Sequence, residues 1–297
     1  MGTKRKIYLP SIQNITAGSA VGSVGTVTLP TNYRIHTIGI EYTDGGGAPT
    51  DILSMFSDII MYGNTKAQRT YTAATLDHLN SLNGTQYARQ QIGAGAAMKQ
   101  FLLIHFAEPW RKDKVDTDAM AVTLDEANGI TDPKLTLKLA TAMPATADLK
   151  VWVRVDDPLP KPKANFALVK RVYQQSVIAS GLSVDLQTLD KKDFYQTIAM
   201  ANPTTGYITK CTLKLNGTPI HELTREGNIA EMVSMGLNPA TSTAASAFAY
   251  DLVLDEDDPI NSALPTQGQD INLKIEFSQA AAGNVNATIE RVGYGWD

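Results

Sequence analysis

Alternation of apolar and polar residues is the dominant pattern along this chain. In LTLKL at 135–139 the three leucines fall on one side of an extended backbone, and LKVWVRV at 149–155 repeats the alternation. Because successive side chains of a strand point to opposite faces, this period predicts strands with one buried face. The loop between them predicts an antiparallel hairpin or meander. INLKIEF at 271–277 and NVNATIERV at 284–292 predict the same hairpin again, with its turn near Gly283.

The succession of patterns occurs twice, once in residues 20–157 and once in residues 175–297. Matched pairs and their offsets are Val27 with Val184 (157), Ile38 with Ile198 (160), Ile60 with Leu213 (153), Leu76 with Ile229 (153), Leu102 with Leu252 (150) and Val153 with Ile289 (136). The offset changes in polar or Gly-rich stretches, where insertions cost little, whereas a one-residue slip inside a strand would reverse its faces. Chance alignment of amphipathic strands is the alternative. The preserved order favours two copies of one β-rich domain.

Each copy contains a tight turn that is followed by a short helix. IMYGNT at 60–65 and LKLNGT at 213–218 both run from an alternating strand into a Gly/Asn pair, which favours a turn. Thr72 and Thr224 then precede apolar residues at helical spacing, and threonine is a favourable N-cap residue. A glycine follows each helical pattern, as expected where a helix ends.

We therefore predict an all-β protein of two tandem antiparallel eight-stranded jelly rolls, each with one short helix. The first jelly roll is expected to span residues 20–157 and the second residues 166–297. Between them, residues 158–165 hold three prolines, which stiffen the backbone and block strand pairing, so this segment is predicted to be a semi-rigid joint. Residues 1–19 match nothing in the second copy and are predicted to form an N-terminal arm.

Composition limits the functions that fit. Of the 297 residues, 43% are hydrophobic and 19% are charged, which is ordinary for a protein with a packed core. The formal net charge of −4 argues against a general nucleic-acid binder, and no specific nucleic acid is expected as a partner. The single cysteine, Cys211, excludes an intrachain disulfide and a cysteine-based zinc site. The apolar runs are too short to cross a bilayer, and the N-terminus lacks the apolar stretch of a secretory signal.

Candidate catalytic chemistry is sparse, so we do not expect an enzyme. The four histidines have no metal-binding spacing, and the motifs of a nucleophile elbow or a phosphate-binding loop are missing. His36 and His105 are expected on strands, as surface or hydrogen-bonded residues. An acidic run could bind Ca²⁺, although it lacks the spacing of an EF-hand and a solvated loop explains it better. Its candidate metal ligands are Asp255, Glu256, Asp257 and Asp258. No other cofactor is expected.

A basic cluster, formed by Lys4, Arg5 and Lys6, marks the N-terminal arm. A solubilising surface is one explanation of this cluster. Because the arm has no counterpart in the second copy, a tether to a neighbouring subunit, an anionic lipid surface or nucleic acid is the other. These three residues are the candidate interaction site.

The chain resembles the double jelly-roll major capsid proteins of tailless, internal-membrane bacteriophages, and among them the coat-protein family of the corticoviruses. The resemblance rests on one element in both halves, IIMYGNT…TLDHLNSLNG and TLKLNGT…IAEMVSMG, and on the order of blocks across residues 20–297. It implies a homotrimer whose six barrels form a pseudo-hexagonal capsomer of an icosahedral virion that encloses a membrane. Some members of the family use Ca²⁺ between subunits, which supports the candidate at 255–258.

The resemblance also implies partners and a location. The expected partners are neighbouring capsomers, minor capsid or membrane proteins, and an internal lipid vesicle that the arm contacts. The protein would be made in the host cytoplasm and would reside in the virion. The competing hypothesis is a two-domain β-sandwich that binds carbohydrate. Such sites use exposed aromatic side chains, but aromatic residues are 7% of this chain and its tryptophans are scattered.

Overall fold

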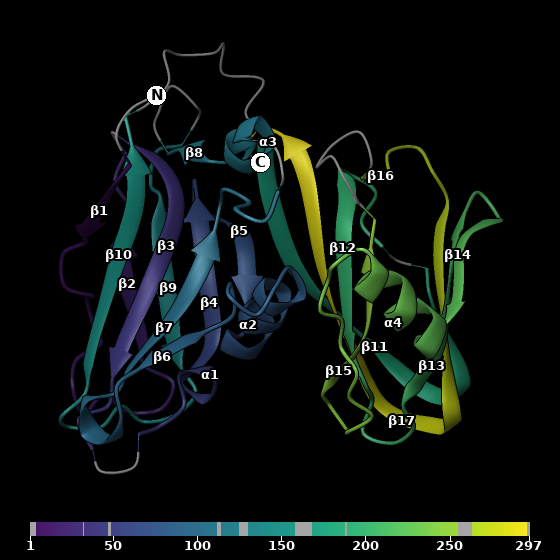
Figure 1. The fold of residues 1–297 in the computed structure, drawn as a ribbon, viewed down its shortest axis with the longest axis horizontal. Helices are drawn as coiled ribbons and strands as arrows, with labels where there is room; N and C mark the ends of the chain where they lie inside the picture. The colour runs from purple at the N-terminus through teal and green to yellow at the C-terminus, as the bar shows by residue number, and fades with distance from the viewer. Residues whose placement is uncertain are drawn as a thin grey trace. The chain divides into compact units, whose positions relative to one another are not determined.

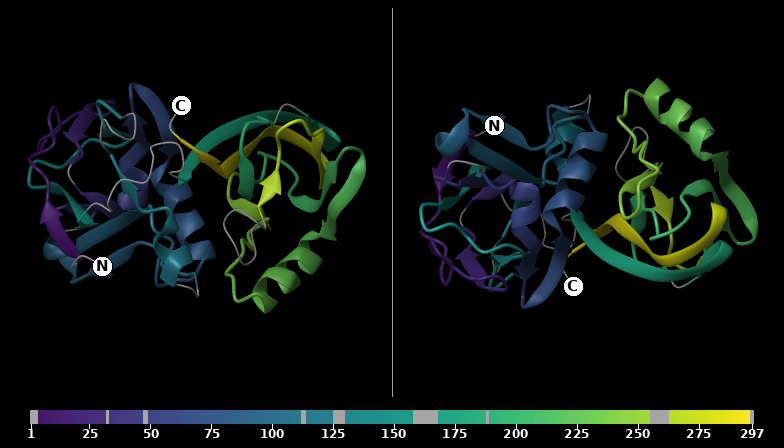
Figure 2. Two further views of the ribbon diagram at one scale, coloured as in Figure 1. Left: turned by 90° about the horizontal axis from the view of Figure 1, so that it is seen from above. Right: turned by 90° about the horizontal axis from the view of Figure 1, so that it is seen from below.

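The computed structural model describes residues 4–31, 33–46, 49–111, 114–124, 130–157, 168–187, 189–254 and 263–295, without the side chains of 114–116. The chain divides into two compact units, each a jelly roll (Figures 1 and 2). The first comprises Met1–Ser81, Thr85–Lys170 and Tyr294–Asp297, and the second comprises Leu82–Gly84 and Arg171–Gly293. The predicted joint at 158–165 lies outside the described residues.

Two sheets face each other in the first unit. The strands of one sheet, in spatial order, are β1 (Arg5–Tyr8), β10 (Asp148–Asp156), β3 (Arg34–Thr43), β7 (Lys99–His105) and β6 (Gln90–Ile92), with β8 (Val122–Thr123) also paired to β3. The strands of the other are β5 (Lys66–Tyr71), β4 (Phe56–Gly63), β9 (Lys134–Leu139) and β2 (Val24–Thr28). The helical segments are α1 (Ile52–Met55), α2 (Ala73–Leu82), a 3₁₀ turn (Gly95–Ala97) and α3 (Lys114–Ala119).

The second unit is organised around two long strands. One sheet runs β14 (Thr218–Thr224), β13 (Ile208–Leu215), β17 (Ile271–Tyr294) and β11 (Leu168–Leu186). In the other, β12 (Phe194–Ala201) pairs with β15 (Phe248–Val253), β16 (Leu264–Pro265) and again β17. Helix α4 (Arg225–Ser234) lies on the side of this unit opposite the paired strands β11 and β17 in both views of Figure 2. Apolar side chains from both sheets form its core.

The pairing register confirms the internal repeat. Ile38 of β3 lies opposite Val153 of β10, and Ile198 of β12 lies opposite Ile289 of β17, which are the offsets of 160 and 136 expected from the sequence. Across the next strand, Ile38 faces Ile104 of β7, and Ile198 faces Leu252 of β15. The equivalence between β7 and β15 is therefore shifted by two residues from the predicted alignment. A shift of two residues keeps the same face of each strand toward the core.

The alignment of β4 with β13 is wrong by one residue. Leu213 pairs with Leu273, and the residue in the corresponding place of the first unit is Ile59, which pairs with Leu137. Ile59 is fully buried, whereas Ile60 is half-buried on the other face. The register of β4 shifts between Phe56 and Asp58 at a β-bulge, and such a bulge changes which residues face inward.

Neither predicted hairpin between the last strand patterns forms. Strands β9 and β10 belong to opposite sheets, and β17 is one continuous strand through Gly283. Its first part pairs with β13 through residue 277, and its last part pairs with β12 from residue 286 onward. The strand therefore bends from one sheet into the other. Alternation alone cannot distinguish such a bend from a turn, because both keep the same faces buried.

The twin turns connect two strands, and each helix follows the second strand of its pair. Asn64 and Thr65 both have positive φ between β4 and β5, as do Asn216 and Gly217 between β13 and β14. Two consecutive residues with positive φ are typical of the tight hairpin turn whose twist matches the strands. The predicted N-caps are confirmed. The hydroxyl of Thr72 accepts from Thr75 N at 3.0 Å, and that of Thr224 accepts from Gly227 N at 3.2 Å.

Candidate functional site

The N-terminal segment, which the sequence set apart as an arm, is built into the first unit. Its strand β1 pairs antiparallel with β10, and Gln13 exchanges backbone hydrogen bonds of 2.9 and 3.1 Å with Thr26 of β2. Ile12 and Ile15 are buried above Gly25, where a β-carbon would stand 2.6 Å from the first and 2.8 Å from the second. Residues 5–16, hereafter the strap, thus cover one edge strand of each sheet.

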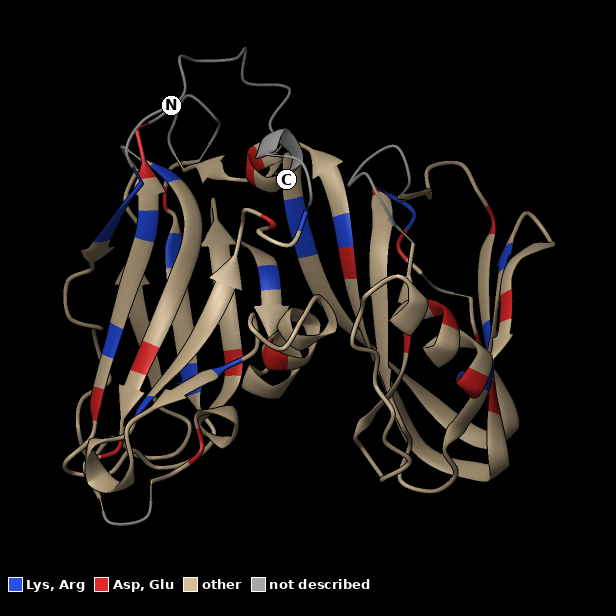
Figure 3. Ribbon diagram, viewed as in Figure 1, with Lys and Arg blue, Asp and Glu red and all other residues tan. Residues whose placement is uncertain are grey.

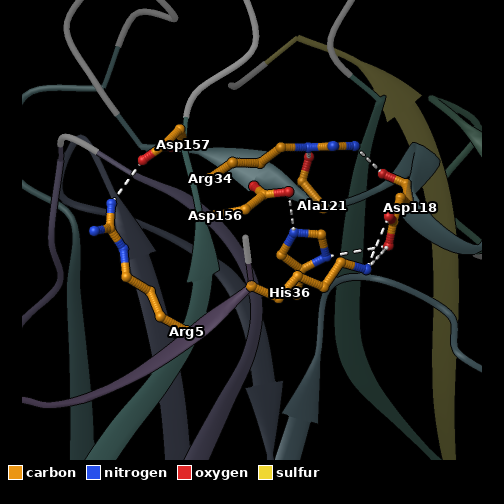
Figure 4. A network of polar contacts seen from close by, with 8 residues as sticks. Arg5, Arg34, His36, Asp118, Ala121, Asp156 and Asp157 are labelled. Atoms are coloured by element: carbon orange, nitrogen blue, oxygen red, sulfur yellow. Dashed lines mark hydrogen bonds and ion pairs between the residues drawn. The ribbon is translucent and has the colours of Figure 1, made fainter. Parts of the chain in front are cut away.

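The three predicted interaction residues lie in or beside the strap. Lys4 Nζ lies 2.8 Å from Asp118 Oδ1, and an Arg5 guanidinium nitrogen lies 2.6 Å from Asp157 Oδ1 (Figure 4). Lys6 Nζ lies 5.4 Å from the centre of the Trp152 ring, within cation–π distance. Exposed ion pairs of this kind contribute little stability, about 0–1 kcal/mol each. Lys4 and Arg5 are nevertheless neutralised locally, whereas the contact of Lys6 is an aromatic ring, which leaves its charge in place.

His36 lies at the centre of the polar network behind the strap. The histidine is 2% exposed, and its ring nitrogens lie 3.0 Å from Asp156 Oδ2 and 3.2 Å from Asp118 Oδ1 (Figure 4). The angles of both contacts fall short of hydrogen bonds. Burial lowers the pKa of His36 below its ordinary value, and the neighbouring carboxylates offset part of this effect. Burial alone would raise the pKa of Asp118, but Lys4 and His36 lower it below the usual range.

Sequence reasoning did not find this network, because its members come from separate parts of the chain. His36 belongs to β3, Asp118 to α3 and Asp156 to the end of β10. Arg34 donates to the backbone carbonyls of Ala121, at 3.3 Å, and of Asp118, which fastens α3 to the sheet (Figure 4). The arrangement joins three elements and contains no nucleophile, so its chemistry is that of structural attachment.

A second buried charge cluster anchors the beginning of β11. Glu108 contacts Lys170 Nζ and lies 2.8 Å from Arg111 Nε, and all three side chains are nearly inaccessible. Arg69 donates to the backbone carbonyls of Lys170, at 3.0 Å, and of His105, at 2.6 Å. Burial works against ionisation of Glu108, but the two cations keep its pKa below the usual range. This cluster holds the strand where it leaves the first unit.

The remaining candidate sites carry no catalytic chemistry within the described residues. Burial raises the pKa of the Cys211 thiol well above its ordinary value, which disfavours the reactive thiolate. The described His, Cys, Asp and Glu residues form no group of three or more that could hold a metal ion. The run Asp255–Asp258 lies outside the described part of the chain. No described helix is long and apolar enough to span a bilayer.

Two family models match the chain, the viral coat protein P2 N-terminal domain over residues 6–156 and the viral coat protein P2 C-terminal domain over residues 169–294. The chain belongs to the viral coat protein P2 family. A coat protein is a structural component of the virion, so the expectation of a non-enzymatic structural protein is confirmed. The comparisons give no support to the carbohydrate-binding alternative.

Solved capsid proteins share the fold of this coat protein. The major capsid protein P2 of bacteriophage PM2 matches with a TM-score of 0.73 at 16% identity, covering 99% of this chain and 98% of that one. The STIV MCP matches with a TM-score of 0.66 at 12% identity, and the PBCV-1 virus capsid with 0.65 at 11%. Both comparisons cover 99% of this chain and 97% of the other. A comparison with curated protein sequences returned no match.

Proposed function

We propose that three copies of this coat protein form one capsomer, a pseudo-hexagonal tile of an icosahedral capsid around a membrane. The observation that carries the proposal is the internal repeat, because two units with one strand order and one register give a trimer six similar barrels. A three-fold assembly can then occupy six-fold positions of a lattice. The solved relatives named above include a major capsid protein and a virus capsid, which is consistent with this role.

Duplication within one chain also permits two different edges. The strap covers strand edges in the first unit, and residues 1–19 have no counterpart in the second. Every copy therefore presents one strapped barrel and one barrel without a strap. Contacts between unlike surfaces are heterologous, and heterologous contacts close into a ring when the rotation between copies is right.

The capsomer state is tested by native mass spectrometry of the purified chain at micromolar concentration. We expect one dominant species of three times the 32.1 kDa mass of the chain. A predominantly monomeric protein under these conditions contradicts the proposal. Electron microscopy of assembled particles then measures whether the trimers tile as pseudo-hexagons.

The N-terminal segment is proposed to contact the lipid vesicle, or a minor capsid or membrane protein, beneath the capsomer. Lys6 is exposed and Tyr8 is 61% exposed, which supports a contact at this edge. Flotation with anionic vesicles tests the lipid partner. Lys6→Glu should abolish co-flotation, whereas Lys66→Glu, a charge reversal at an exposed position of β5, should not. Equal flotation of both variants and the parent would exclude lipid contact through Lys6.

Calcium between subunits remains a further proposal for the run at 255–258. Its four consecutive carboxylates supply the oxygen ligands that Ca²⁺ prefers. Chelation by EGTA should then lower the thermal midpoint of the trimer, and Asp255→Asn with Asp257→Asn should remove that response. Equal midpoints with and without EGTA in the parent protein would argue against a calcium site.

A further inference from the structure

Two neighbouring strands of the second unit share a long stretch without charge. Residues 173–184 of β11 and 277–289 of β17 contain no Lys, Arg, Asp or Glu, although 19% of the whole chain is charged. The two strands pair with each other, and Figure 3 shows their common bend without red or blue. We name the outward-facing side chains of this stretch the β11–β17 strip. Its exposed members are Gln174, Ser176, Ile178, Ser180, Leu182, Ser183, Ser278, Gln279, Ala280, Ala282, Asn284 and Asn286.

The strip carries the most exposed large apolar side chains among the described residues. Ile178 is 74% exposed and Leu182 is 66% exposed. They stand four residues apart on one face of a strand, which places them roughly 13 Å apart. Small or amide side chains surround them, so a partner can approach closely and no charge has to be desolvated. Large apolar groups in an uncharged patch are typical of the centre of a protein–protein interface.

The strand that bears these residues pairs with β17 within the second unit. Charges and prolines are the residues that natural sheets use to prevent association with other chains, and residues 173–184 have neither. The strip therefore lacks these ordinary obstacles to association.

The first unit shows how the strand that corresponds to β11 is covered by a segment of the same chain. Val27 of β2 corresponds to Val184 of β11 in the repeat, and β2 is bridged at Thr26 by Gln13 of the strap. The strap buries Ile12 and Ile15 there. In the second unit the preceding residues belong to the same continuous strand, β11, instead of folding back.

The repeat also diverges at this place. The first-unit counterpart of the β17 bend is the connection between β9 and β10, with Asp148 and Lys150 paired at 2.5 Å just beyond it. In the second unit the connection has become continuous strand, and the two charges have become Asn284 and Asn286 at the offset of 136. Two barrels of common origin thus differ in a surface that makes no contribution to either core.

We infer that the β11–β17 strip is the surface by which the second unit binds a second copy of this chain, and this inference rests on the proposed trimer. The absence of charge indicates which kind of partner binds the strip. A lipid surface or nucleic acid would be held by cations, and the strip has none. Copies of this chain all carry a net charge of −4 and repel through charged faces, whereas an uncharged face lets them meet without burying an unpaired charge.

Substitution of the two apolar residues tests the inference. Ile178→Lys with Leu182→Lys should shift the trimer–monomer equilibrium at least tenfold toward monomer in native mass spectrometry. Ile178→Ser with Leu182→Ser should shift it less, in the same direction. The matched control is Ile220→Lys with Val233→Lys, since these residues are 46% and 57% exposed elsewhere on the second unit. The control should remain trimeric, and circular dichroism should show all variants folded.

Thiol labelling provides an independent measurement of whether the strip is covered in the trimer. Because the single native cysteine, Cys211, is buried, Ser180→Cys introduces the one accessible thiol of the described chain. Maleimide should react with it more than tenfold more slowly in the trimer than in a chain that also carries Ile178→Lys and Leu182→Lys. Ala245→Cys on an exposed loop should react equally in both. Equal rates at position 180 in both states would overturn the inference.

The outcomes separate this inference from the proposed function. If the parent is trimeric and the lysine variant also forms trimers and particles normally, the capsomer proposal stands. The same result refutes the assignment of the strip as an interface. A lysine variant that assembles normally but loses vesicle flotation also refutes it and assigns the strip to lipid. A monomeric parent protein refutes both. Loss of trimers or particles in the lysine variant alone supports the strip.

Discussion

Replacement of His105 by phenylalanine should make the first unit more resistant to mild acid. The histidine ring packs against Tyr87 and Trp110, with centroid distances of 6.0 and 5.6 Å. Neither ring nitrogen has a hydrogen-bond partner among the described residues. Burial, together with the nearby cations Lys170 and Arg69, lowers the pKa of His105 to about 4, although Glu108 acts in the opposite direction. Phenylalanine keeps the aromatic contacts and cannot titrate.

The direction and the size of this pH effect on stability follow from the difference in the pKa of His105 between the folded and unfolded states. An unfolded histidine titrates near 6.5, so below that pH the unfolded chain binds a proton that the folded chain refuses. Stability is therefore lost as pH falls through 6.5 toward the folded value. With a folded pKa of about 4, the loss from this one residue is roughly 1.4 kcal/mol at pH 5.5 and roughly 2.5 kcal/mol at pH 4.5.

Urea unfolding followed by tryptophan fluorescence at pH 7.0, 5.5 and 4.5 measures this loss. Trp110 and Trp152 both belong to the first unit, so the signal reports the unit that holds His105. The His105→Phe variant should lose less stability than the parent over this range, by the amounts above. His78→Phe, on α2, is the control substitution. Equal losses of unfolding free energy between pH 7.0 and 4.5 in the parent and in the His105→Phe variant would refute the reasoning.

Three further sets of substitutions test other parts of the fold. Glu108→Ala leaves Lys170 buried without its carboxylate and should cost about 3–5 kcal/mol in thermal unfolding, whereas replacing both residues with Leu and Met should cost less. Asn80 and Asn228 each donate from a helix to a strand carbonyl at 2.8 Å. Alanine at either should cost about 1–2 kcal/mol in urea unfolding, and the two losses should add because the contacts lie in separate units. Gly25→Ala forces a methyl group against the isoleucines of the strap and should expose the N-terminal residues to limited proteolysis; unchanged cleavage would contradict that packing.

The periodic features of this fold were accessible from the sequence. The equivalence of Ile38 with Ile198, and of Val153 with Ile289, was predicted correctly, because apolar residues at every second position specify a face. The caps at Thr72 and Thr224 were predicted because they depend on residues only three positions away. The features that depend on the local spacing of residues were therefore predicted correctly.

The errors concern features that spacing does not encode. A bulge near Phe56 shifted one strand by a residue, and the bend of β17 resembled a turn because Gly283 stands inside it. The charge cluster at His36 was missed because its carboxylates come from α3 and β10, elements that only the folded chain brings together. The strap was predicted as an N-terminal arm because it lacks a repeat partner, and its spacing gave no sign of the buried isoleucines that it contributes to the first unit.

The lack of a repeat partner for the strap has a consequence for assembly. In the first unit, a segment of the same chain pairs with Val155 and Thr26. In the second unit, the equivalent strand carries Ile178 and Leu182 in the open. In the proposed trimer the six contacts need not be equal, because each copy would offer one barrel covered by its own strap and one barrel covered by a neighbouring copy. This asymmetry would favour a heterologous contact, and a closed ring of three copies would then cover every exposed strip once.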